Sequence, residues 1–389
     1  MRDEPIYLDH AATSPIWPDV LDAMMPFLTS AYGNPSAVYG PGRQARHALE
    51  KCRARVAELL GVGPGEIVFT SGGSESNNAV FHQLTSFLLT SPIEHESVRE
   101  SVRRLPSATK VVFASPDESG IISSKEVLQA IKGLHVDARK DPLASFMTVN
   151  NELGSINPIK ELAETLRSHG CRFHTDAVQA AGVMDLSKIA PHVDYMTLSG
   201  HKMGGPKGVG VLVVRAGAPY RSFLAGGSQE QERRAGTENV AAIVGFTRAL
   251  ERSVHDREQA VVKMEGLRAR LVDGLQGALQ HHIRFNSPLK HLSSPHIINF
   301  VCLDDKGEGL DGEMLILGLD MRGVYVSAGS ACSSGTLKAS KVLTSLGMSE
   351  KVAKGAIRVS ICSRTTAEEM DQAVQRISET VARMVKAGA

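Results

Sequence analysis

Apolar and polar residues alternate with two different periods along the first half of the chain. Residues 48–60 place apolar side chains at helical spacing, and this pattern stops at Gly61, a residue type that often ends a helix. Short runs of β-branched and aromatic residues follow, of which 67–70 is the first. Further strands are predicted at 111–113, 145–149, 172–174, 195–198 and 209–214, with a helix at 158–168. This alternation predicts an α/β fold in which helices cover a parallel sheet.

The pattern changes after about residue 250. A long charged helix is predicted over roughly 252–280, and short strands are predicted near 297–301 and 358–361. A chain of 389 residues exceeds the length at which a single core usually stops growing. We therefore predict a large domain over 15–255 and a smaller α+β domain formed by 1–14 and 256–389.

Composition narrows the possible partners. The 43 basic and 42 acidic residues leave a formal charge of +1, which disfavours nucleic acid or an acidic membrane surface as the ligand and favours a small molecule. The five cysteines are widely spaced and contain no C-x-x-C pair, as expected for a reducing compartment. We expect a cytoplasmic protein, because the sequence shows neither a signal peptide nor an apolar stretch of membrane-spanning length.

Polar segments directly follow several predicted strands, where open α/β sheets bind their ligands. Residues 72–75 (Gly-Gly-Ser-Glu) lie between a strand and a helix, so their free N–H groups could hold a phosphate. Ser74 is an equally good helix cap. The sequence has no G-x-x-x-x-G-K-[ST] segment and no well-placed G-x-G-x-x-G segment. It therefore lacks the segments that most strongly indicate binding of ATP or of a dinucleotide.

A lysine and an aspartate follow two other strands. Lys202 ends the segment Ser-Gly-His-Lys among glycines, which suits a Schiff base with an aldehyde cofactor; a lone loop lysine is more often simply solvated. Asp176 lies at an upstream strand end and could keep a pyridine nitrogen protonated. Its alternative role is to cap a helix or a turn.

His95 begins a helix-like stretch with the sequence His-Glu. No second histidine follows at the spacing of a zinc protease, so no metal is expected. The more specific interpretation is that the His95 ring stacks on a flat cofactor and takes part in proton transfer. The alternative is an ordinary surface histidine.

One cysteine lies in an unusual context. Cys332 is surrounded by glycine, serine and alanine over residues 327–335, a composition that suits a nucleophilic thiol that must travel to a substrate. Buried structural cysteines are commoner overall. The other four are predicted to be small core hydrophobes: Cys52, Cys171, Cys302 and Cys362.

Taken together, these segments resemble the cysteine desulfurases, closest to the nitrogen-fixation-type branch, over nearly the whole chain. The matching segments are 7–13, 33–36, 69–78, 150–154, 174–179, 199–202, 233–239 and 330–332. The resemblance implies a pyridoxal 5'-phosphate enzyme of fold type I, with a mixed, mostly parallel seven-stranded sheet in its large domain. It also implies the conversion of L-cysteine to L-alanine, with the sulfur left on an enzyme cysteine as a persulfide.

The same resemblance implies roles for individual residues. Lys202 would hold the cofactor and move the Cα proton, His95 would stack on the ring, Asp176 would pair with the pyridine nitrogen, and Cys332 would take the sulfur. Asn151 and Gln179 would hydrogen-bond near the phenolic oxygen, with Asn151 also near the substrate. The implied phosphate ligands are Gly73, Ser74, Ser199 and His201.

Two further roles concern the substrate and the assembly. Arg358 matches the arginine that binds the substrate carboxylate, for which a bidentate guanidinium is well suited; its alternative is a surface ion pair. Thr237 matches a residue that reaches the phosphate of a neighbouring subunit, which implies a homodimer with shared active sites. A sulfur-acceptor or iron–sulfur scaffold protein is the expected partner.

Three other functions remain open at this level. A selenocysteine lyase would share the fold and most of these segments. An ordinary aminotransferase would contain Cys332 incidentally, and it would consume a keto acid. A non-catalytic scaffold would have no need of Lys202, Asp176, His95 and Cys332 together.

Overall fold

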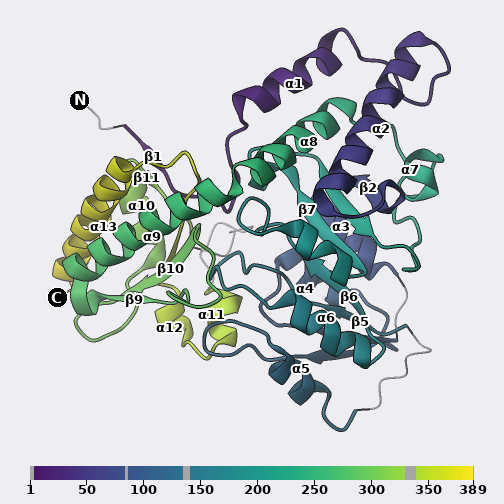
Figure 1. Ribbon diagram of the computed structural model, residues 1–389. Helices are drawn as coiled ribbons and strands as arrows, with labels where there is room; N and C mark the ends of the chain where they lie inside the picture. The colour runs from purple at the N-terminus through teal and green to yellow at the C-terminus, as the bar shows by residue number, and fades with distance from the viewer. Residues whose placement is uncertain (1–3, 84–85, 135–140, 329–338, 389) are drawn as a thin grey trace.

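A seven-stranded sheet organises the larger part of the molecule. The computed structural model describes residues 4–83, 86–134, 141–328 and 339–388 (Figure 1). The strand order is β2-β8-β7-β6-β5-β3-β4; β8 runs antiparallel to both of its neighbours and the other pairs are parallel. The strands are β2 (Ile67–Thr70), β8 (Gly210–Val214), β7 (Tyr195–Ser199), β6 (Arg172–Asp176), β5 (Leu143–Ser145), β3 (Phe87–Thr90) and β4 (Lys110–Phe113).

Helices cover both faces of this sheet, as the continuous burial of its central strands requires. In β8, Val211 and Val213 belong to one core cluster and Leu212 and Val214 to another, because successive side chains of a strand point to opposite faces. Helices on the first face are α2 (Gly40–Leu60), α5 (Ser124–Ile131), α6 (Ile159–Ser168) and α8 (Val240–His255); those on the second are α3 (Gly73–Phe81) and α4 (Glu96–Arg103).

The helix that ends before β2 follows the predicted pattern. α2 ends at Gly61, whose φ of 65° lies in the left-handed region, which confirms the predicted helix end. α1 (Pro18–Thr29) and α8 pack against each other, and α2 also packs on α8 (Figure 1).

The smaller region has its own sheet and its own core. Strands β9 (Ile283–Phe285), β10 (Ile297–Cys302) and β12 (Ala356–Ser360) form an antiparallel sheet, and β1 (Ile6–Tyr7) pairs with β11 (Val324–Tyr325). The core of this region includes Ile6 beside residues of the C-terminal part of the chain, such as Leu271 and Phe300. Its N-terminal strand therefore belongs with the C-terminal segment, although the limits 1–14 and 256–389 stay a prediction.

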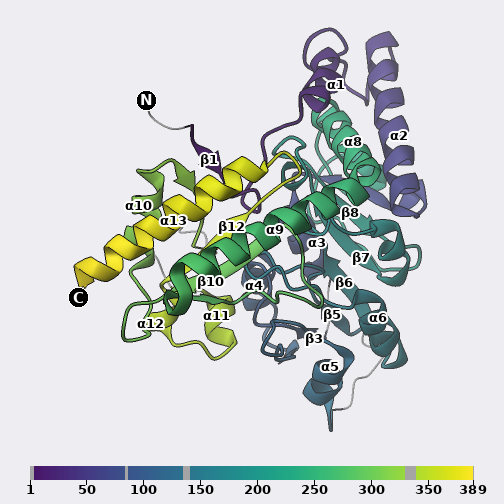
Figure 2. The ribbon, with the colours of Figure 1, turned by 60° about the vertical axis from the view of Figure 1, so that its left-hand side comes forward.

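The helix predicted over roughly 252–280 is confirmed, but it begins five residues later than predicted, because residues 252–255 belong to the preceding helix. The chain forms α8 and α9 (Arg257–Leu279), which meet at Asp256. α8 packs on the large sheet, whereas α9 packs beside α13 (Ala367–Gly388) in the small region (Figure 2). The two helices pack on different cores: α8 contributes to the core of the large sheet, and α9 contributes to the core of the small region.

The remaining helices are α7 (Gln229–Glu232), α10 (Gly312–Asp320), α11 (Lys341–Ser345) and α12 (Glu350–Ala353). None of the helices in the described residues combines the length and apolar content needed to cross a membrane.

Candidate active site

A cavity of about 520 Å³ lies where the carboxyl ends of β6 and β7 meet the small region. Segments that are far apart in the sequence meet there, because parallel strands present their ends at one edge of the sheet. Of the predicted site residues, the cavity contains Gly73, Ser74, His95, Asn151, Asp176, Gln179, Ser199, His201, Lys202 and Arg358.

Lys202 lies in a single 3-10 turn directly after β7. Its Nζ donates hydrogen bonds of 2.7 Å to the carbonyl oxygens of Ala11 and Ala12, so the N-terminal segment holds the amine in the cavity. Burial, and next the positive charge of Arg358, lower the pKa of Lys202 to about 8. A sizeable fraction of this amine is therefore neutral and nucleophilic near neutral pH.

Asp176 ends β6 and is 6% exposed. Its Oδ1 accepts the N–H of Val178 at 3.0 Å, and its Oδ2 accepts Nδ2 of Asn77 at 2.8 Å. Asn77 Nδ2 also donates to Oγ of Ser97 at 2.9 Å, so α3 and α4 together fix the carboxylate. Asn77 has no role among the sequence-based predictions, although it lies in one of the matching segments.

His95 caps the N-terminus of α4, and its Nδ1 accepts the N–H of Ser97 at 3.1 Å. Because Nδ1 accepts this bond, the neutral ring carries its proton on Nε2. Burial lowers the pKa of His95, against the opposing effect of Asp176. The imidazole that lines the cavity is therefore neutral, so it is able to accept a proton.

Arg358 is 4% exposed and therefore makes no surface ion pair. Its guanidinium donates to Asp9 Oδ1 at 2.7 Å and to the carbonyl oxygen of Asn151 at 2.9 Å. Its Nε is buried without a hydrogen-bond partner in the described structure. Asp9, which is not among the predicted site residues, thus orients the Arg358 guanidinium in the cavity wall.

The start of α3 forms one end of the cavity, beside a second hollow of about 350 Å³ that also contains Gly73, Ser74, Ser199 and His201. A Cβ on Gly73 would lie 3.0 Å from Cγ2 of Val178, so a side chain there would crowd this wall. Burial, and next Lys202, lower the pKa of His201 to about 4, which keeps its ring neutral. Free N–H groups, hydroxyls and a neutral ring suit a phosphate.

Glu94 is a further residue that the sequence did not identify. It lines the cavity but is 1% exposed, and its Oε1 accepts the N–H of Met147 at 3.0 Å. Burial raises the pKa of Glu94 well above its usual value, and the nearby charge of Asp176 adds to this effect. Burial thus favours the protonated form of this carboxyl.

Comparison with known proteins agrees with this geometry. The family model described as Aminotransferase class-V matches residues 6–373. The chain belongs to this family. The relatives include a cysteine desulfurase IscS from Methanosarcina thermophila, 35% identical over 98% of this chain and 93% of the relative. Another, from Clostridium botulinum strain Hall, is 35% identical over 97% of this chain and 95% of the relative.

Solved structures of the family share the fold. A NifS-like protein superposes with a TM-score of 0.87 at 34% identity, covering 97% of this chain and all 100% of the other. A structure described as SspA in complex with cysteine has a TM-score of 0.76 at 30% identity, covering 93% of this chain and 100% of the other. The chain is thus a fold-type-I pyridoxal-phosphate protein.

Thr237 does not line the cavity of its own chain. The residue is exposed. Its loop is held to α3 by the ion pair of Arg234 with Glu75, at 2.9 Å. Cys332 lies outside the described residues.

The prediction for the other cysteines is correct for three of them and wrong for Cys362. Cys52, Cys171 and Cys302 are buried, whereas Cys362 is half-buried. Cys362 follows the end of β12 instead of continuing it, so its side chain leaves the core. It lines a different cavity, and Lys202 and Gln179 line both this cavity and the active-site cavity.

Proposed function

We propose that this protein is a pyridoxal-phosphate-dependent cysteine desulfurase that converts L-cysteine to L-alanine and leaves the sulfur on Cys332 as a persulfide. The observation that carries the proposal is the grouping of three charged groups around one cavity. Lys202 presents an amine of lowered pKa, Asp176 a fixed carboxylate and Arg358 a buried guanidinium. Family membership agrees with this chemistry.

The residues present fit pyridoxal 5'-phosphate. Bound there, the cofactor would supply an electron sink for the bonds at the substrate Cα. We propose that Asp176 pairs with its pyridine nitrogen, that His95 stacks on its ring, and that Asn151 and Gln179 hydrogen-bond near its phenolic oxygen. The proposed phosphate ligands are Gly73, Ser74, Ser199 and His201.

The chain's own side chains would divide the remaining work. Arg358 would bind the substrate carboxylate, because its buried guanidinium lines the cavity. Lys202 would move the Cα proton, because its pKa of about 8 allows it both to accept and to release a proton near neutral pH. His95 would assist the proton transfers.

Sulfur transfer would then occur at Cys332. Its thiolate attacks the substrate sulfur, an S–S bond forms, and the Cβ–S bond breaks with its electron pair passing to the substrate carbon. A proton completes the methyl group of alanine, so no external oxidant or reductant is consumed. An unperturbed thiol has a pKa of about 8.5, so His95 or the substrate amine would help to deprotonate it.

We also propose a cytoplasmic homodimer in which Thr237 completes the phosphate site of the partner. The exposed position of Thr237, outside the cavity of its own chain, supports this arrangement. The persulfide would pass to an acceptor protein such as an iron–sulfur scaffold.

The decisive test compares Cys332→Ala with Cys362→Ala. We expect Cys332→Ala to keep its cofactor and release almost no sulfide, and mass spectrometry after brief exposure of the wild type to L-cysteine to find one extra sulfur on the Cys332 peptide. Sulfur on Cys362 would contradict the assignment. Parallel assays with L-selenocysteine and with keto acids separate this activity from a lyase and an aminotransferase.

A further inference from the structure

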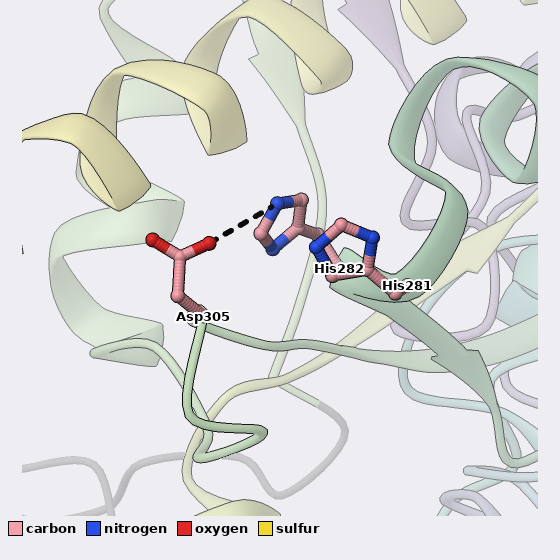
Figure 3. A group of neighbouring side chains, drawn as sticks. All are labelled: His281, His282 and Asp305. Atoms are coloured by element: carbon pink, nitrogen blue, oxygen red, sulfur yellow. Dashed lines mark ion pairs between the residues drawn. The ribbon is translucent and has the colours of Figure 1, made fainter.

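Three potential metal ligands converge on the small region, away from the active site. The ligand atoms of His281, His282 and Asp305 all lie within 4.8 Å of one another (Figure 3), and none of the three lines the active-site cavity. We propose that they form a binding site for a divalent transition-metal ion of the zinc class.

The hydrogen bonding of His282 prepares one of its nitrogens for a metal. Nδ1 lies 3.1 Å from the carbonyl oxygen of Leu303, which can only accept a hydrogen bond, so Nδ1 carries the proton of the neutral ring. The lone pair is then on Nε2, which faces Oδ1 of Asp305 at 3.7 Å (Figure 3). A backbone carbonyl behind a ligating imidazole is the usual support of a metal-bound histidine.

The backbone holds Asp305 near this ring. The N–H of Leu303 donates to the carbonyl oxygen of His282 at 2.8 Å. Next in the chain, Oδ1 of Asp304 accepts the N–H groups of Lys306 and Glu308 at 2.9 and 2.8 Å. Asp305 therefore projects from a turn that is closed on itself and tied to the histidine pair.

A strained turn directly precedes His281. Gln280, between α9 and β9, has a φ of 51°, which is unfavourable for a residue with a side chain. The two histidines follow it, and their rings lie 4.0 Å apart between centroids at an interplanar angle of 42°. A shared ion would hold two neighbouring imidazoles on the same side of the chain.

The spacing is close to that of a tetrahedral ion. Metal–ligand bonds of about 2.0–2.2 Å place two tetrahedral ligands about 3.3–3.6 Å apart. His282 and Asp305, at 3.7 Å, nearly meet this condition. His281 and Asp305 are exposed, so their side chains are free to move closer to a shared ion from separations that are all within 4.8 Å.

The ligand types select the metal. Two imidazoles and one carboxylate favour zinc, nickel or copper, whereas magnesium and calcium prefer oxygen ligands alone. Water would fill the remaining positions. The ion would join the end of α9 to the turn after β10, so that binding should also stabilise the folded protein.

The test measures zinc binding to the holoenzyme by calorimetry with zinc chloride in a non-chelating buffer. His281→Ala and Asp305→Asn alter exposed side chains, and we expect each to weaken binding at this site at least tenfold. His291→Ala is the matched control, because His291 is an exposed histidine outside the group, and it should bind zinc as the wild type does. Any zinc binding to active-site thiols is the same in all of these proteins, so it does not affect the comparison.

A second readout is the melting temperature. Zinc should raise it in the wild type and in His291→Ala, and should raise it less in His281→Ala. Wild-type zinc affinity in both His281→Ala and Asp305→Asn would overturn the proposal. So would an equal loss in His291→Ala, which would indicate unspecific binding to surface histidines.

Discussion

Lys202 shows how a residue type acquires a function from its surroundings. The side chain of a free lysine has a pKa of 10.5, whereas burial and Arg358 lower that of Lys202 to about 8. Deprotonation is favoured because the cavity wall disfavours a second cation beside Arg358. The neutral, nucleophilic form of Lys202 is thus half-populated near pH 8, whereas that of an exposed lysine is half-populated near pH 10.5.

A pH experiment tests this property. The rate at which cofactor-free protein reacts with pyridoxal 5'-phosphate should rise with pH through a midpoint near 8, because only the neutral amine attacks an aldehyde. Absorbance follows the reaction, and borohydride reduction with peptide mapping should place the label on Lys202. Label on the exposed Lys207, or a rise only near the 10.5 of a free lysine, would contradict the assignment.

Arg358 permits a quantitative prediction. Loss of a charge-assisted bond to the substrate carboxylate should cost about 1.5–3 kcal/mol, so Arg358→Ala should raise the KM for cysteine about ten- to a hundredfold. Cofactor content should change little. The control is Arg270→Ala, which removes an exposed arginine paired with Asp371 in the small region. An unchanged KM in Arg358→Ala would make Arg358 structural.

Among the elements, the turn before α3 requires a glycine. Gly72 has a φ of 149° and a ψ of −175°, a conformation open essentially only to glycine. Gly72→Ala should cost on the order of 1–3 kcal/mol and displace the N–H groups of the proposed phosphate site. We expect at least a tenfold weaker affinity for pyridoxal 5'-phosphate, measured by spectroscopic titration.

Gly65 supplies the matched control for this substitution. A Cβ there would meet nothing within 4 Å, so Gly65→Ala should leave cofactor affinity unchanged. Equal affinity in both variants would show that the α3 turn does not hold the phosphate.

The predicted elements were correct where local pattern and tertiary environment agree. β2 was predicted at its observed bounds because its short apolar run is buried on both faces. The strand predicted at 145–149 is observed as β5 at Leu143–Ser145. It ends at Ser145 because the N–H of Met147 donates to the Glu94 carboxylate and not to β3. β3 was missed, since its leucines give no specific strand signal.

At the scale of the whole molecule, the proposed shared site can be tested by mixing subunits. A dimer of one Lys202→Ala and one Thr237→Ala subunit would place both defects in one site and leave the other intact. Such mixed dimers, isolated with two affinity tags, should recover about half the wild-type activity, provided that each homodimer is inactive. Absence of recovery would show that Thr237 does not act across the interface.

The sequence by itself determined the α/β class and the identity of Lys202, Asp176 and His95 as candidates, because periodicity and residue type are local properties. Arg358 is a candidate only through the resemblance to the cysteine desulfurases. Only the tertiary structure decided that Asn77 fixes Asp176 and that Asp9 orients Arg358. Long-range contacts and burial also set the lowered pKa of Lys202. These effects depend on distances between segments that the fold brings together, and no local pattern in the chain encodes such distances.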